Sequence, residues 1–221
     1  MNIANNISEI KKHLPENVKL VCVSKFHSND EIMEAYNAGE RIFGESRVQE
    51  LCLKEKSLPE DIQWHFIGHL QTNKIKLIVS LIDLIHGVDS YRLLVTINNA
   101  AKSVNKIVNC LLQVHIAQEE SKFGFSPEEL IETLESGEYV ALKNVQICGI
   151  MGMATFTDDE MQIATEFSHL KQVFDIAKNR FFSDNDAFRE ISMGMSDDYQ
   201  LAIAHGSTMV RVGSSIFGAR V

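Results

Sequence analysis

The sequence predicts a single (β/α)8 barrel domain over residues 1–221. Eight short apolar or β-branched segments are each expected to be a strand, and their starts are 19 to 45 residues apart. That spacing is too long for hairpins and fits strand–helix units. The count of eight, and the lack of a glycine-rich dinucleotide turn after the first strand, favour a barrel over a doubly wound open sheet.

The expected strands lie at residues 18–25, 41–45, 62–68, 84–88, 108–116, 145–153, 190–195 and 209–213. Helical periodicity fills most of the gaps between them, and no linker or domain boundary interrupts the chain. In such a barrel the chemistry lies at the C-terminal ends of the strands.

Two of the expected helices have clear start signals. Ser28 and Glu31 form an S-x-x-E capping box after the first strand. A later helix is expected to begin after Ser126, with Pro127 in its first turn, and to stop near Gly137.

Thr157 and Glu160 are predicted to open the longest helix. Its apolar face is expected to comprise Met161, Ala164, Phe167, Phe174, Ala177 and Phe181.

Composition excludes several classes of protein. The formal net charge of −9 argues against a general binder of nucleic acid or of anionic membranes. No apolar run reaches the roughly 18 residues that a membrane span needs, and the first ten residues do not form a signal peptide. The four cysteines are far apart, so no CxxC pair is present. We expect a cytoplasmic protein with reduced thiols.

Lys25 stands at the end of the first expected strand, after an apolar run. A lysine that points into the barrel mouth is desolvated, which lowers its pKa and makes it a nucleophile. The alternative is a strand-end lysine that extends to water, and for a lone lysine this alternative is the stronger.

A phosphate site is expected after the last two strands. The backbone at Gly213 and Ser214, with the hydroxyls of Ser192 and Ser214, could bind a phosphate there, as barrels often do. The alternative is that these glycines and serines only form turns. Arg211 lies two residues before Gly213 on the same side of its strand, where it needs an anion or an acceptor ring. An amine, an arginine and a phosphate site together suit a ligand with an aldehyde and a phosphate.

On these residues the sequence resembles the pyridoxal phosphate homeostasis proteins of the YggS/PROSC type. The resemblance runs from about residue 18 to residue 220. The most specific matches are WHFIGHLQTNK at 64–74 and SMGMSDD at 192–198. Further matches lie at residues 23–25, 43–45, 48–50, 121–124 and 206–213.

The resemblance implies a barrel like the N-terminal domain of alanine racemase. It implies pyridoxal phosphate held as a Schiff base on Lys25. It also implies phosphate contacts at Ser192, Gly213 and Ser214, and Arg211 beside the pyridine nitrogen.

The chain departs from the family pattern at two positions near the expected site. Ser46 stands where the family has an asparagine that contacts the cofactor and is a candidate for the same contact, and His27 replaces a second lysine. His65 faces either the barrel interior near the cofactor or the outside, according to strand parity. Lys122, after the fifth strand, is either a second amine for releasing the aldehyde or a loop lysine in water. No metal site is expected.

Three functions remain open at this point. The first is a monomeric carrier that buffers pyridoxal phosphate and delivers it to apo-enzymes. The second is a small amino-acid racemase, which needs an acid or base on each face of the substrate. Lys25 could serve one face, but only seven residues follow Ser214 and no second domain is expected to supply the other. The third is a Schiff-base aldolase, which lacks a proton relay beside Lys25 and leaves Arg211 unexplained. We therefore expect a carrier and not an efficient enzyme.

Overall fold

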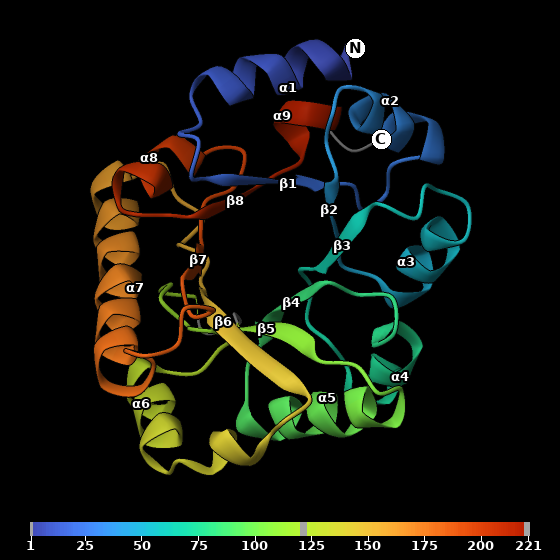
Figure 1. Ribbon diagram of the computed structural model, residues 1–221. Helices are drawn as coiled ribbons and strands as arrows, with labels where there is room; N and C mark the ends of the chain where they lie inside the picture. Colours follow the sequence, from blue (N-terminus) through green and yellow to red (C-terminus); the bar gives the residue numbers. More distant parts are fainter. Residues whose placement is uncertain (1, 120–122, 219–221) are drawn as a thin grey trace.

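In the computed structural model, which describes residues 2–119 and 123–218, eight parallel strands close into a barrel in chain order (Figure 1). The strands are β1 (Lys19–Val23), β2 (Ile42–Glu45), β3 (Gln63–Phe66), β4 (Leu84–Val88), β5 (Val108–Gln113), β6 (Val145–Met151), β7 (Glu190–Ser192) and β8 (Met209–Val212). Because β1 pairs with β8, the barrel prediction is confirmed and the open sheet is excluded.

Helices surround this ring of strands in Figure 1. They are α1 (Ile3–Lys12), α2 (Asn29–Asn37), α3 (Val48–Glu55), α4 (Ile75–Ile78), α5 (Tyr91–Ser103), α6 (Pro127–Glu135), α7 (Glu160–Phe181), α8 (Tyr199–Ala204) and α9 (Ser214–Phe217), with short 3₁₀ turns at Thr72–Lys74 and Glu138–Ala141. No helix in the described part of the chain is long and apolar enough to cross a membrane.

All eight expected strands are present, but several are shorter than their apolar runs. The strand expected at 18–25 ends at Val23, so Lys25 lies in the turn that follows. The strand expected at 190–195 ends at Ser192, and Gly194 turns the chain with φ +93°. Past the end of β7 the apolar Met193 is still buried, whereas Phe26, past the end of β1, is 47% exposed.

The two predicted helix starts are confirmed. Ser28 and Glu31 form a reciprocal capping box at α2, and Ser126 caps α6 with Pro127 in the first turn. Gly137, with φ +68°, follows the end of α6, where a left-handed residue is expected.

The predicted start and apolar face of α7 are wrong in part. Asp159 caps this helix in place of Thr157, because its carboxylate accepts from two N–H groups of the first turn. Met161, expected on the buried face, is 81% exposed. The buried stripe comprises Ile163, Glu166, Phe167, Leu170, Val173 and Ala177. Phe167 and Ala177 belong to both sets, and Phe174 and Phe181 are partly buried against the core, so the predicted face overlaps the buried stripe in part.

The core has two layers. Most buried residues lie between the strands and the helices. A smaller cluster fills the barrel interior and comprises Val21, Leu84, Leu111, Met151 and Met209. Polar side chains share this interior, and they connect to the functional site.

Candidate functional site

A cavity of about 240 Å³ opens among the C-terminal ends of the strands. Its lining comprises Val23, Lys25, His27, Ile67, Met153, Met195, Ser196, Asp197, Arg211, Gly213, Ser214 and Gly218. The barrel therefore brings four of the predicted site residues together: Lys25, Arg211, Gly213 and Ser214. The volume lies just below the usual range for ligand pockets, about 300–1,000 Å³, and suits one small ligand.

Lys25 supplies the amine of this cavity. It lies two residues after β1 in a turn and is half-buried. The aliphatic side chains of Val23 and Ile67 also line this cavity. His27, from the same turn, also lines the cavity; its ring stacks on Phe217 at 4.6 Å between centroids.

Ser196 and Gly213 form the polar end of the cavity. Ser196 Oγ accepts a hydrogen bond of 3.2 Å from the Gly213 N–H and a longer one of 3.5 Å from the Ser215 N–H. A Cβ atom at position 213 would lie 3.2 Å from Val23 Cβ, so the glycine lets β8 approach the end of β1 closely. Hydroxyl and backbone N–H groups are the donors that bind a phosphate in such loops.

Arg211 is buried inside the barrel, 4% exposed. Its Nη1 atom donates to Ser192 Oγ at 2.6 Å and its Nη2 atom donates to the carbonyl oxygen of Gly152 at 3.1 Å. Burial lowers the pKa of the guanidinium to about 10, with Asp198 acting in the opposite direction. Arg211 remains cationic at pH 7, and it is one of the residues that line the cavity.

A chain of hydrogen bonds runs from Arg211 through the barrel. Ser192 Oγ lies 3.0 Å from His86 Nδ1, and His86 Nε2 lies 3.0 Å from His65 Nδ1. Burial lowers the pKa of His65 to about 3, aided by the charge of Lys19. Burial, His65 and Arg211 lower the pKa of His86. Both imidazoles are therefore neutral at pH 7.

Because both rings are neutral, the donor and acceptor of each hydrogen bond in this series can be assigned. Ser192 accepts from Arg211, so its own proton goes to His86 Nδ1. His86 then carries its proton on Nε2 and donates to His65. His65 lines a second cavity, at the opposite end of the barrel beside Lys19.

Three predicted residues lie away from the main cavity. Ser192 is fully buried and its hydroxyl bonds to Arg211 and His86. His65 points inward, but at the other end of the barrel, and Ser46 lines neither cavity. Lys122 falls outside the described residues. In the described part of the chain, no group of three or more His, Cys, Asp or Glu side chains could hold a metal ion.

Residues that the sequence reasoning did not select are Ser196, Asp197, His27 and His86. Ser196 and Asp197 stand in the SMGMSDD stretch, and their place after Gly194 was the available signal. His86, inside an apolar strand between Ile85 and Gly87, carried no comparable signal.

Comparisons with known proteins place the chain among relatives with the same fold. A family model described as the alanine racemase N-terminal domain matches residues 1–221. A pyridoxal phosphate homeostasis protein of Helicobacter pylori is 41% identical over 202 residues, which cover 90% of this chain and 87% of the relative. One of Schizosaccharomyces pombe is 39% identical over 209 residues, covering 92% and 85%.

The chain belongs to the pyridoxal phosphate homeostasis protein family. A solved structure of PipY from Synechococcus elongatus, described as with PLP bound, is 34% identical with a TM-score of 0.88 and covers 98% of this chain and 100% of its own. An alanine racemase of Clostridium difficile has a TM-score of 0.75 at 15% identity; this chain spans 56% of its length, so this likeness concerns the fold alone.

Proposed function

We propose that this protein binds pyridoxal phosphate in the cavity at the top of the barrel and keeps it available to apo-enzymes. One observation carries the proposal: an amine, a guanidinium and a cluster of hydroxyl and N–H groups line the same small cavity. The bound group supplies an aldehyde that condenses reversibly with an amine. In this proposal Lys25 is that amine and holds the ligand as a Schiff base.

The other end of the ligand is assigned to the polar end of the cavity. Ser196, Gly213 and Ser214 would bind the phosphate through hydroxyl and N–H groups. Aliphatic side chains, among them Val23 and Ile67, suit the faces of a planar ring. The names of the relatives, which mention pyridoxal phosphate, and the PLP-bound PipY structure support this ligand.

Arg211 favours a carrier over an enzyme. A cation beside the pyridine nitrogen disfavours protonation of the ring, and an unprotonated ring withdraws electrons less strongly. Among the described residues that line the cavity, none is a tyrosine that could act as a second base opposite Lys25. All groups that the proposal needs come from one chain and one domain, which fits a monomer. We also propose a cytoplasmic location, since apo-enzymes would receive the cofactor there.

The test is a binding titration that compares pyridoxal phosphate with pyridoxal, followed through absorbance. Charge-assisted hydrogen bonds contribute about 1.5–3 kcal/mol each, so two or three of them should make pyridoxal bind at least a hundred-fold more weakly. Equal affinities would refute the phosphate site. The transfer of bound ligand to an apo-enzyme, measured by the recovery of that enzyme's activity, tests delivery.

A further inference from the structure

We infer that Glu50 and Lys54 are positioning residues, which direct the Lys25 side chain into the cavity by holding a left-handed turn at Phe26. The inference rests on the proposed function, because it concerns the amine that holds the ligand. It assigns a role to a buried charged cluster behind the site that the binding proposal does not use.

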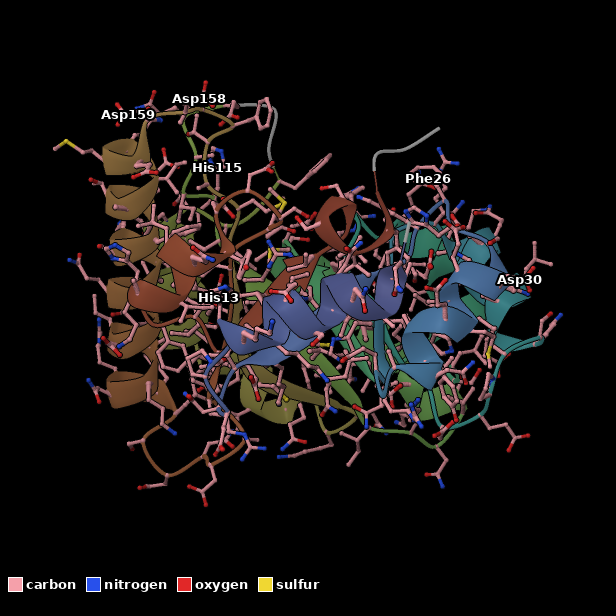
Figure 2. The ribbon with its side chains drawn as sticks, turned by 90° about the horizontal axis from the view of Figure 1, so that it is seen from above. His13, Phe26, Asp30, His115, Asp158 and Asp159 are labelled. Atoms are coloured by element: carbon pink, nitrogen blue, oxygen red, sulfur yellow. The ribbon has the colours of Figure 1, made fainter. Side chains whose placement is uncertain are left out.

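Phe26, directly after Lys25, has an unfavourable backbone conformation. Its φ angle is +71°, a left-handed value that residues with a side chain rarely adopt. The side chain is 47% exposed and lies at the rim, on the same side of the molecule as His115 and Asp158 (Figure 2). Its ring contacts the Arg47 guanidinium at 4.3 Å. Since the ring is not buried in the core, core packing does not account for the conformation.

Two hydrogen bonds hold the backbone on either side of Lys25. The Phe26 N–H donates to Glu50 Oε1 at 2.6 Å. The carbonyl oxygen of Ser24 accepts from Lys54 Nζ at 2.8 Å. Both holding residues belong to α3, so one helix fixes the chain before and after the amine.

Lys54 is itself held in place by three acceptors. Besides the Ser24 carbonyl, its ammonium donates to Glu45 Oε1 at 2.8 Å and to Glu50 Oε1 at 2.6 Å. Lys54 is 5% exposed and Glu45 is fully buried. The Ser24 hydroxyl also donates to Glu45 Oε1, at 2.6 Å. A buried ion network of this kind is costly to break, so it resists movement of the turn.

The geometry of the turn controls the direction of the amine. The Ser24 end is fixed to β2 by its N–H bond to Gly44, and α2 begins at Asn29. Between these fixed points, relaxation of Phe26 to a negative φ requires compensating rotations at its neighbours. Rotation at Lys25 would redirect its Cα–Cβ bond. An amine that points away from the cavity loses the alignment that speeds attack on a bound carbonyl.

The test measures the reactivity of Lys25 towards salicylaldehyde, an aldehyde without phosphate, in the presence of cyanoborohydride. The amine nitrogen attacks the aldehyde carbon, and one water leaves as the C=N bond forms. Cyanoborohydride then adds hydride to that carbon while the nitrogen takes a proton from water, which gives a stable secondary amine. Peptide mass spectrometry then gives the labelling rate at Lys25.

Glu50→Ala should lower this rate about ten-fold, the effect of losing one charge-assisted hydrogen bond. Glycine adopts φ +71° without strain. The double variant Glu50→Ala/Phe26→Gly should therefore return the rate to within about two-fold of the parent. A residue that only stabilised the fold would not be rescued in this way. Circular dichroism and thermal unfolding confirm that each variant is folded.

Two further variants sharpen the result. Asp175→Ala removes the carboxylate of another i,i+4 pair, with Lys171, far along the chain from this turn, and should leave the rate unchanged. Glu50→Gln keeps an oxygen acceptor but not the charge, and should lower the rate two- to five-fold, again reversed by Phe26→Gly.

A wild-type rate in Glu50→Ala, or a loss that Phe26→Gly does not restore, would overturn the inference and leave the proposed function standing. No label on Lys25 in the parent protein would count against the proposed function itself, and the inference would fall with it.

Discussion

The guanidinium of Arg211, on β8, donates to the Oγ atom of Ser192, at the end of β7, over 2.6 Å inside the barrel. The Nη1 atom makes this bond, and the Nη2 atom donates to the carbonyl oxygen of Gly152. Arg211 also lines the cavity. Ser192 thus supports the arginine, while the serine four residues later, Ser196, lines the cavity. The two hydroxyls should therefore have separable effects.

Ser192→Ala removes an acceptor from Arg211 and a donor to His86. The free energy of unfolding should fall by about 1–3 kcal/mol, because buried polar groups lose a partner. The ratio of the dissociation constants for pyridoxal and pyridoxal phosphate should stay constant. Ser196→Ala should lower that ratio about ten-fold with little effect on stability. Urea unfolding and absorbance titration measure the two effects, and a ratio that responds to Ser192→Ala alone would reverse the assignment.

Stability should depend on pH through the buried histidines. The pKa of His65 is about 3 in the folded protein and about 6.5 when unfolded. Between these values the unfolded chain binds a proton that the folded protein does not. The free energy of unfolding is therefore highest above about pH 6.5. It declines from there towards pH 3, by up to ~1.4 kcal/mol per pH unit for each such histidine.

His65→Gln should make this decline shallower, because the glutamine amide keeps an acceptor for His86 but does not titrate. The measurement is urea unfolding at pH 7.5, 6.5 and 5.5 for both proteins. Parallel slopes over this range would show that His65 does not contribute to the pH dependence.

Lys54→Met should destabilise the fold by about 3–5 kcal/mol at pH 7, because it leaves the Glu45 carboxylate buried without a cation. Burial already raises the pKa of Glu45, and loss of Lys54 raises it further. The folded variant takes up a proton as the pH falls, so the deficit should shrink on acidification. Lys12→Met, which removes an exposed pair with Glu9, is the control and should change little. A loss of stability in Lys54→Met that does not change with pH would show that the buried Glu45 carboxylate is not its cause.

The protein loaded with pyridoxal phosphate should show no substantial racemase or transaminase turnover. Lys25 is the amine of the cavity and Arg211 disfavours a protonated ring. Incubation with single-enantiomer amino acids and with 2-oxo acids, followed by chiral chromatography, measures turnover. Rates in the usual enzyme range of about 1–10³ s⁻¹ that vanish in Lys25→Ala would favour the racemase instead.

The fold could be predicted from the sequence because hydrophobic periodicity indicates the helices and the spacing of the apolar segments indicates the strands. Eight apolar segments, spaced along the chain as strand–helix units are, predict the closed barrel. The S-x-x-E box at Ser28 predicts the start of α2. The residue at which each strand ends could not be predicted, because apolar residues near Lys25 and Gly194 continue into the loops. The end of a strand depends on backbone conformation, which composition does not specify.

The site could be predicted only where its residues lie at strand ends. Lys25, Arg211 and Gly213 converge because parallel strands bring their C-terminal ends together. The link from Ser192 to His86 joins β7 to β4 across the interior, and spacing along the chain cannot reveal a contact 106 residues apart. The left-handed turn at Phe26 likewise depends on two residues of α3, Glu50 as an acceptor and Lys54 as a donor.

The central claim is that Lys25 holds pyridoxal phosphate covalently in the cavity at the top of the barrel. The most direct measurement is borohydride reduction of the protein incubated with pyridoxal phosphate, followed by peptide mapping, with Lys25→Ala in parallel. The account predicts a visible absorbance band that disappears on reduction, a phosphopyridoxyl group on the Lys25 peptide, and neither feature in a folded Lys25→Ala. A stable label on another lysine, or an unchanged spectrum in Lys25→Ala, would contradict it.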